Sequence, residues 1–145
     1  HKAGVGGEVK LALGGKVDPA FGPPVGVVAT VTALSDGKFL FEGPMQRGVP
    51  VDMGPSAAIK SGGVEVVIAS RRYQNYDRMF FLSLGIDPNA RAVVGVKSAQ
   101  HFRAAYQPMA SEVVVVDEGN GITTRDFSAR TYTRIRRPIF PLDLD

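Results

Sequence analysis

The sequence predicts a mixed α/β (α+β) fold, with an antiparallel, β-rich N-terminal half followed by a parallel βαβαβ C-terminal half. Two observations predict this division, which falls at about Gly63. Prolines and glycines crowd the first half and keep helices out of it. In the second half, compact valine runs alternate with stretches that have one apolar helical face. The length of 145 residues predicts one domain over 1–145, and 44% hydrophobic with 21% charged residues predicts a packed core.

The first half is expected to consist of strands separated by tight turns. Each strand is marked by alternating or β-branched residues and is followed by glycine or proline. These expected strands cover residues 9–13, 25–34, 39–41 and 57–60. The dipeptide Asp36-Gly37, which follows the second of them, is a favoured hairpin turn. The N-terminal half is therefore predicted to be a twisted antiparallel sheet.

The second half is expected to alternate strands with helices. The expected strands are residues 64–69, 91–96 and 113–116, and the expected helices are residues 76–84 and 99–106. Consecutive parallel strands need a crossover connection, and such crossovers are right-handed. This order therefore predicts a parallel sheet.

Composition and charge exclude several classes of function. The net charge is +3, with the arginine excess late in the chain, and residues 130–137 are interpreted as a strand with arginines on its solvent face rather than as a nucleic-acid surface. No apolar run approaches the ~18 residues of a membrane span. Without cysteine there is no disulfide, thiolate metal site or cysteine nucleophile, which suits the cytoplasm. We expect neither nucleic-acid nor membrane partners.

The candidate site is predicted at the carboxyl ends of two strands, where open parallel sheets bind ligands. The strand 64–69 leads into Arg71, and the strand 91–96 leads into residues 97–103. We predict that substrate is bound by the residues Arg71, Lys97, Ser98 and Arg103, with His101 as the candidate catalytic residue. Ser98 is also placed to cap the helix 99–106, whose free N–H groups would attract a carboxylate, a peptide carbonyl or an oxyanion.

Structural alternatives remain open for these residues. Ser98 as a cap alone, and His101 as a hydrogen-bonded structural residue, explain the same pattern. A contact between Ser98 and His101 would resemble an activated nucleophile, but no acidic residue is placed to complete it. A catalytic zinc takes three protein ligands, and His101 with scattered carboxylates does not provide them. We therefore predict no metal ligand in this chain.

Several short motifs in this chain occur in a characteristic order. The glycine- and proline-rich motifs occur at residues 4–6, 13–16, 23–25, 35–37, 43–44, 53–54 and 85–88. The more specific motifs are Lys-Ser-x-x-His-Phe-Arg at 97–103 and Arg-Arg-Pro-Ile-x-Pro-Leu-Asp at 136–143. The latter is expected to be structural, with Arg137 paired to Asp143. Together these motifs resemble the C-terminal domain of the microcystinase C (MlrC)-like zinc metallopeptidases, and the resemblance extends over nearly the whole chain.

The resemblance implies a longer peptidase whose N-terminal domain holds the zinc. This chain, which begins without Met, would be the C-terminal part of a protein that hydrolyses peptide or amide bonds. It would supply scaffold and substrate-facing residues, with no zinc of its own and no activity alone. The implied partners are the N-terminal metal-binding domain and a peptide substrate, with homo-oligomer formation open. The alternative is a non-catalytic module that binds an anion or another protein.

Overall fold

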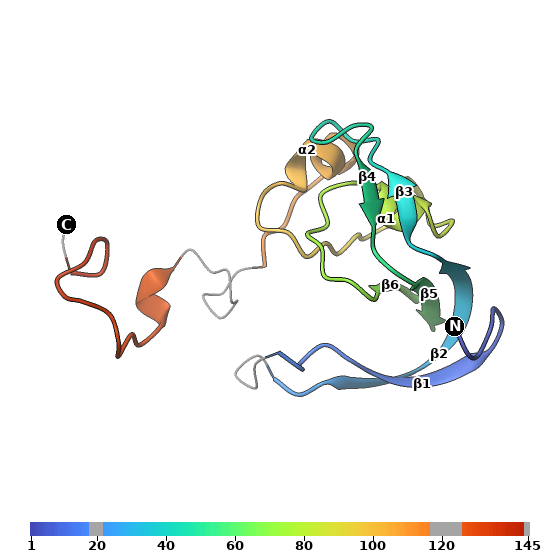
Figure 1. The fold of residues 1–145 in the computed structure, drawn as a ribbon, viewed down its shortest axis with the longest axis horizontal. Coiled ribbons are helices and arrows are strands. Elements are labelled where there is room, and N and C mark those ends of the chain that lie inside the picture. Colours follow the sequence, from blue (N-terminus) through green and yellow to red (C-terminus); the bar gives the residue numbers. More distant parts are fainter. Residues whose placement is uncertain (18–21, 117–125, 144–145) are drawn as a thin grey trace. The chain divides into compact units, whose positions relative to one another are not determined.

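A computed structural model describes residues 1–17, 22–116 and 126–143 (Figure 1). The contacts between Cα atoms divide the chain into two compact units. The first consists of His1–Leu13 and Val25–Val113, and the second of Gly14–Pro24 and Val114–Asp145. The single domain expected over 1–145 stays a prediction. No helix in the described residues has the length and apolar character needed to cross a membrane.

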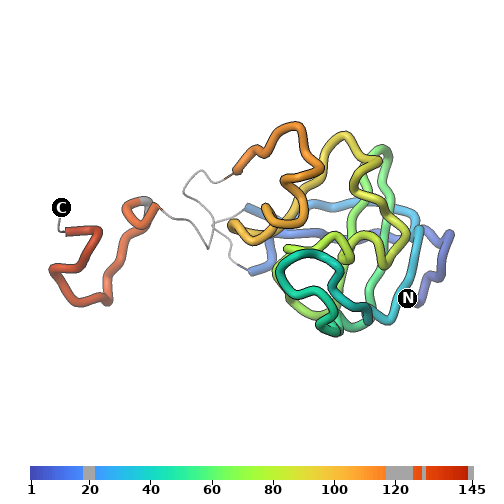
Figure 2. Tube along the Cα trace, turned by 90° about the horizontal axis from the view of Figure 1, so that it is seen from above, coloured from blue at the N-terminus to red at the C-terminus, as the bar shows by residue number. Residues whose placement is uncertain are grey.

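The first unit is built on a four-stranded antiparallel sheet. Its strands are β1 (Glu8–Leu13), β2 (Val25–Ser35), β5 (Ser56–Ser61) and β6 (Val64–Ala69), in the order β1-β2-β5-β6. Strands β1 and β2 run side by side in both Figure 1 and Figure 2. The pairing places Val9 opposite Ala29, and Val31 opposite Ile59, so that apolar side chains share one face. All four strands coincide closely with predicted ones.

A smaller second sheet pairs β3 (Lys38–Leu40) with β4 (Pro50–Asp52), again antiparallel. The predicted hairpin at Asp36-Gly37 is wrong, because β2 pairs with β1 and β5 and not with β3. The turn is instead a corner where the chain leaves one sheet for the other. Gly37 allows this corner with a φ of 77°, and its carbonyl accepts a hydrogen bond of 2.9 Å from the Met53 amide.

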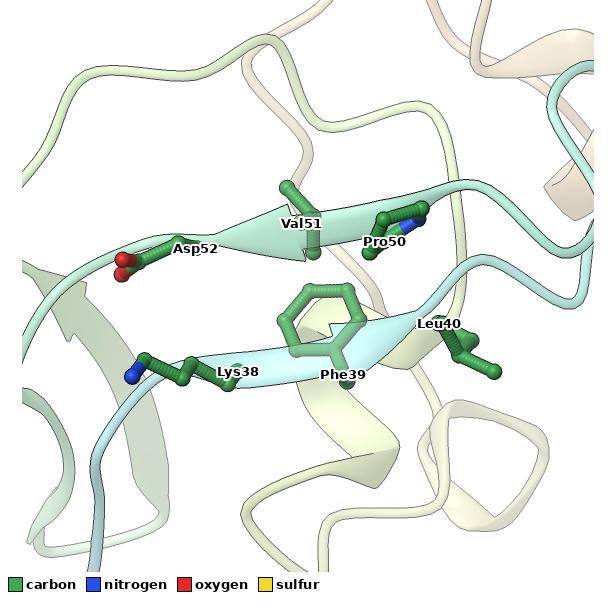
Figure 3. Close-up of a pocket in the computed structure, with 6 residues that line it drawn as sticks. All are labelled: Lys38, Phe39, Leu40, Pro50, Val51 and Asp52. Carbon is green, nitrogen blue, oxygen red and sulfur yellow. The ribbon is translucent and has the colours of Figure 1, made fainter.

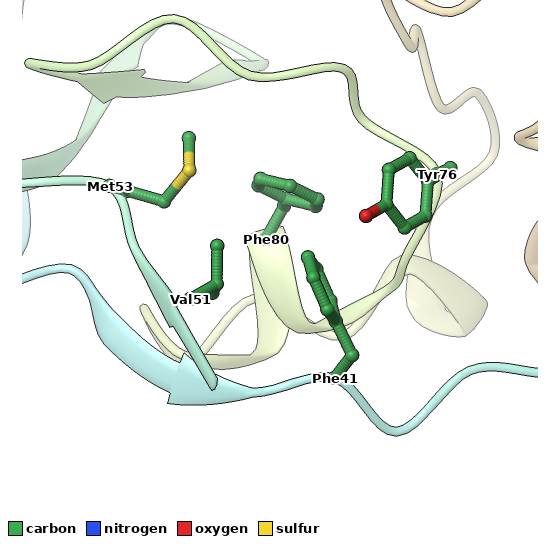
Figure 4. Packing of buried hydrophobic residues seen from close by; sticks show 5 residues of the cluster. All are labelled: Phe41, Val51, Met53, Tyr76 and Phe80. Carbon is green, nitrogen blue, oxygen red and sulfur yellow. The ribbon is translucent and has the colours of Figure 1, made fainter. Parts of the chain in front are cut away.

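The second sheet packs through an aromatic core (Figure 4). This cluster contains the buried residues Phe41, Val51, Met53, Tyr76 and Phe80. Phe39 packs edge-on against Phe80, with 5.5 Å between the ring centroids. Such T-shaped pairs are favourable beyond the burial of area alone. The core therefore fixes the chain around residues 76–80 to the strands β3 and β4.

The helices are much shorter than predicted. The two α-helices are α1 (Met79–Leu82) and α2 (Arg103–Tyr106), and the 3₁₀ turns of this unit are η2 (Pro88–Ala90) and η3 (Gln107–Met109). The expected helices 76–84 and 99–106 are thus wrong in extent. The Asp77 carboxylate accepts the Met79 amide at 2.9 Å, and Ser98 Oγ accepts the Phe102 amide at 3.3 Å. Side chains that bind nearby backbone amides in this way compete with helix formation.

The predicted parallel βαβαβ half is also wrong. The run 64–69 does form a strand, β6, but it pairs antiparallel with β5. The turn Gly62-Gly63 joins the two strands directly, and so short a link permits only an antiparallel pair. Neither 91–96 nor 113–116 forms a strand within the described residues. The observed fold is therefore mixed, with antiparallel sheets and few helical turns.

The described residues of the second unit include the 3₁₀ turn η4 (Phe127–Ala129) and a closing loop. The predicted pair of Arg137 with Asp143 is confirmed by an ion pair, and the Ile139 amide donates to Asp143 Oδ2 at 2.8 Å. The peptide bonds before Pro138 and Pro141 are cis. The strand expected at 130–137 is wrong, because these residues adopt bends and irregular backbone.

Candidate functional site

The side-chain amide of Gln74 links two of the predicted site residues. Gln74 lies in the segment after β6, and its Nε2 donates to Ser98 Oγ at 2.9 Å. Its Oε1 lies 3.2 Å from Nδ1 of His101. Because a carbonyl oxygen only accepts, this contact fits the neutral tautomer of His101 that carries its proton on Nδ1, and in that tautomer Nε2 is an acceptor. We call Gln74, Ser98 and His101 the glutamine bridge.

The hydroxyl of Ser98 is oriented by what it accepts. Besides the Gln74 amide, its oxygen accepts the Phe102 N–H at 3.3 Å. With two donors on the oxygen, the hydroxyl proton is available to an outside acceptor. The bridge therefore combines a hydrogen-bond donor on Ser98 with an acceptor on the exposed His101.

The prediction that Ser98 is the N-cap of the helix is wrong. The residue that caps α2 is Phe102, without a side-chain hydrogen bond, and not Ser98. A helix of four residues aligns too few peptide dipoles to attract an anion at its start. The anion site expected there is therefore not formed by the helix.

Buried polar groups hold the segment that follows Gln74. The Asp77 side chain is 2% exposed, and its two oxygens accept the amides of Gly43 at 2.7 Å and Met79 at 2.9 Å. The Tyr106 hydroxyl lies 2.6 Å from Asn75 Oδ1 and 2.8 Å from the Asp77 carbonyl oxygen. Burial raises the pKa of Tyr106, so the hydroxyl stays protonated and keeps donating at neutral pH. Hydrogen bonds thus hold residues 75–77 in place directly after Gln74 of the glutamine bridge.

The other predicted residues make separate contacts. Arg71 pairs with Asp52 at 2.7 Å. The pKa of Asp52 is lowered, first by the hydrogen bond from the Gly54 amide and further by the charge of Arg71. Arg103 lies over the Phe102 ring, 5.4 Å from its centroid. Lys97 is exposed and forms no ion pair within the described residues.

The structure therefore brings Ser98 and His101 together through Gln74. The side chains of Arg71, Lys97 and Arg103, all within the described residues, make no hydrogen bond or ion pair with either residue. The reasoning from parallel strand ends does not explain this, because Arg71 follows an antiparallel strand. Sequence reasoning missed Gln74 altogether. Its only signal was its position soon after the end of a strand, since nothing in a lone glutamine 24 residues before Ser98 indicates a contact. The functional roles of all five predicted residues stay predictions.

Neither of two hollows on the described residues of the first unit is lined by the glutamine bridge. The larger, about 550 Å³, is an open and mainly apolar depression over β3 and β4, with Lys38 and Asp52 at one end (Figure 3). The smaller, about 310 Å³, has Glu42 and Arg78 among its lining residues. The bridge therefore lies outside both hollows.

Residues 1–17, 22–116 and 126–143 contain no group of three His, Cys, Asp or Glu side chains that could hold a metal ion. The donor set of these residues does not fit a catalytic metal, which takes about three protein ligands.

Fold and site define a mixed α/β domain that carries a small Ser–Gln–His surface and, in its described residues, no metal centre. The chain belongs to the family described as MlrC C-terminus, whose model matches residues 1–134. It is 28% identical, over 142 residues, to Microcystinase C from Sphingomonas sp, covering 98% of this chain. The chain spans about a quarter of that relative, 26% of its length.

A solved structure shares the fold. It is that of a Mesorhizobium sp. BNC1 protein assigned provisionally to the metallopeptidases. It matches 75% of this chain and 22% of its own with a TM-score of 0.65, at 24% sequence identity. At this identity the likeness shows a common fold.

Proposed function

We propose that this chain is the C-terminal domain of an MlrC-like zinc metallopeptidase that hydrolyses peptide or amide bonds. The observation that carries the proposal is the family match over residues 1–134, together with a relative named Microcystinase C that is about four times as long. In this proposal the zinc site belongs to an N-terminal domain, and this chain supplies scaffold and substrate-facing residues.

The glutamine bridge supports the proposal through its chemistry. His101 Nε2 can accept a backbone N–H, and the Ser98 hydroxyl can donate to a backbone carbonyl oxygen. The N–H and C=O of one trans peptide bond point in opposite directions, so this pair suits the N–H and C=O of one residue in an extended peptide. In catalysis, Nε2 of His101 would instead take a proton from the attacking water and pass it to the leaving amine nitrogen, which makes His101 a catalytic residue in this proposal. Lys97, Arg71 and Arg103 would attract the carboxylates of a peptide.

A second candidate function is a non-catalytic module that binds an anion or a protein. The observation that favours it is the exposed Lys97, which lies next to the bridge in the chain and has no ion pair among the described residues. Such a module would use the same donors for an anionic ligand and would need no metal.

Metal content and peptide hydrolysis separate the two candidates. The complete reading frame that encodes this chain is expressed beside the 145-residue chain, and both are assayed for bound zinc and for cleavage of linear peptides. We expect zinc and cleavage in the complete product, loss of cleavage on chelation, and recovery on adding zinc back. Stoichiometric zinc on the 145-residue chain, or a zinc-loaded product that cleaves no peptide in a mixed library, would contradict the peptidase proposal.

A further inference from the structure

Residues 92–97 have the side-chain pattern of a strand but no neighbouring strand. Val94 and Val96 are partly buried against the cluster of Phe102, Ala105 and Tyr106. The residues that alternate with them lie on the other side, since Val93 is 87% exposed and Gly95 is exposed. Alternation with a period of two is the pattern of an extended strand with one covered face.

The backbone of this segment is unpaired. Within the part of the chain that the structure describes, no backbone hydrogen bond involves the amide or carbonyl groups of residues 92–97. Bonds occur on either side, from the Arg91 amide to Pro88 at 3.3 Å and from the Arg103 amide to Gln100 at 3.1 Å. Arg91 enters the segment in an extended conformation, with φ −118° and ψ 138°. The free groups of such an extended segment are ready to pair with another strand.

The side chains of the segment do not protect this edge. Proteins usually guard an open edge with proline, inward charges or a covering element. Here residues 92–96 are alanine, valine and glycine, and the first charge is Lys97 at the end of the segment. An exposed valine beside unpaired backbone is typical of a strand whose partner is supplied from outside.

We infer that residues 92–97 form a β-strand by pairing with a strand from the part of the longer protein that lies outside this chain. This inference rests on the proposed function, which makes the chain one domain of such a protein. The chain covers only 26% of the Sphingomonas relative, so most of that relative lies outside it. The segment also leads directly into Ser98 and His101, so a strand paired here brings the neighbouring domain beside the glutamine bridge.

Hydrogen–deuterium exchange of the amides tests the pairing. We expect the amides of 92–97 to exchange at nearly the unprotected rate in the 145-residue chain, and at least about 100-fold more slowly in the complete product of the reading frame. The central strand β5 (Ser56–Ser61), which pairs on both sides, serves as the internal control and is protected in both. Protection of every second amide indicates one partner strand, and protection of all of them indicates two; both support the inference.

A charge at Val93 tests the same surface by mutation. Val93→Lys leaves the melting temperature of the 145-residue chain unchanged, because the side chain is 87% exposed there. In the complete product it removes the protection of 92–97. Val5→Lys, at a valine that is 65% exposed, is the matched control and removes none.

Three results would overturn the inference. They are equal exchange of 92–97 in both proteins, protection that appears in the 145-residue chain as its concentration rises (which indicates a second copy), and a reading frame that encodes no further domain. Slow exchange without any peptide cleavage would instead overturn the proposed function and leave the strand pairing supported. Peptide cleavage with unprotected amides at 92–97 would support the proposed function and overturn the strand pairing.

Discussion

At the scale of single residues, Gln74 determines which nitrogen of His101 is available. Its carbonyl oxygen faces Nδ1, which keeps the proton there and leaves Nε2 free. We predict that ¹⁵N chemical shifts of His101 at neutral pH or above report mainly the Nδ1–H tautomer. In Gln74→Ala the ring loses this partner, and the population shifts toward the Nε2–H tautomer that an unconstrained histidine favours.

The control for this prediction is the neighbouring glutamine. Gln100 is exposed, and its side chain makes no hydrogen bond to the described residues, so Gln100→Ala should leave the tautomer of His101 unchanged. A native protein with mainly Nε2–H, or identical spectra for the native protein and Gln74→Ala, would show that the bridge does not orient His101.

The proximity of Ser98 and His101 could be predicted because both lie in one short motif, where spacing along the chain is itself information. Gln74 could not be found in this way. Its contact with Ser98 spans 24 residues and depends on how the segment after β6 returns to the turn at 98–102. The partner of Arg71 was missed for the same reason, since Asp52 is brought near by the pairing of β3 with β4.

At the scale of elements, the corner at Gly37 is the feature on which the two sheets depend. A Cβ added there would lie 2.0 Å from the Gly54 carbonyl oxygen, and the residue has a φ of 77°. Gly62, in the turn between β5 and β6, has a φ of 56° but nothing within 4 Å of an added Cβ. An alanine would therefore be strained by the left-handed backbone at both positions, and only at Gly37 would its Cβ also clash with neighbouring backbone.

We predict that Gly62→Ala lowers the free energy of unfolding by about 1–2 kcal/mol, the cost of a left-handed conformation alone. Gly37→Ala should cost more than about 3 kcal/mol, because backbone atoms must also move. Urea denaturation of the two variants measures the difference. Equal costs would show that the corner can open without disturbing either sheet.

The strands of the first half were predictable because alternation and glycine turns are local features. The pairing of strands was not, and two errors follow from it. Asp36-Gly37 has the sequence of a hairpin turn but joins two sheets. The valine run 91–96 has the composition of a strand but, in the described part of the chain, no partner. The lengths of the helices were predicted wrongly for a different reason. The side chains of Asp77 and Ser98 bind backbone amides that a longer helix would use.

At the scale of the whole molecule, we propose that this chain and an N-terminal domain have different roles in one protein. This chain contains a donor and an acceptor suited to a peptide backbone. They lie beside a segment that hydrogen bonds of Asp77 and Tyr106 hold in place. Its described residues contain no cluster that fits a metal. The chain belongs to the MlrC C-terminus family and spans about a quarter of the Sphingomonas relative, and in our proposal peptidase activity needs this chain together with an N-terminal domain.

The most direct measurement of this claim is the kinetics of peptide hydrolysis by the zinc-loaded complete product with His101→Ala, beside the matched variant Gln100→Ala. Removal of a proton-transfer group lowers turnover by about 100-fold or more. We therefore expect kcat to fall at least that far for His101→Ala, with unchanged zinc content and melting temperature, and to stay at the native value for Gln100→Ala. Native kcat in His101→Ala would contradict the account.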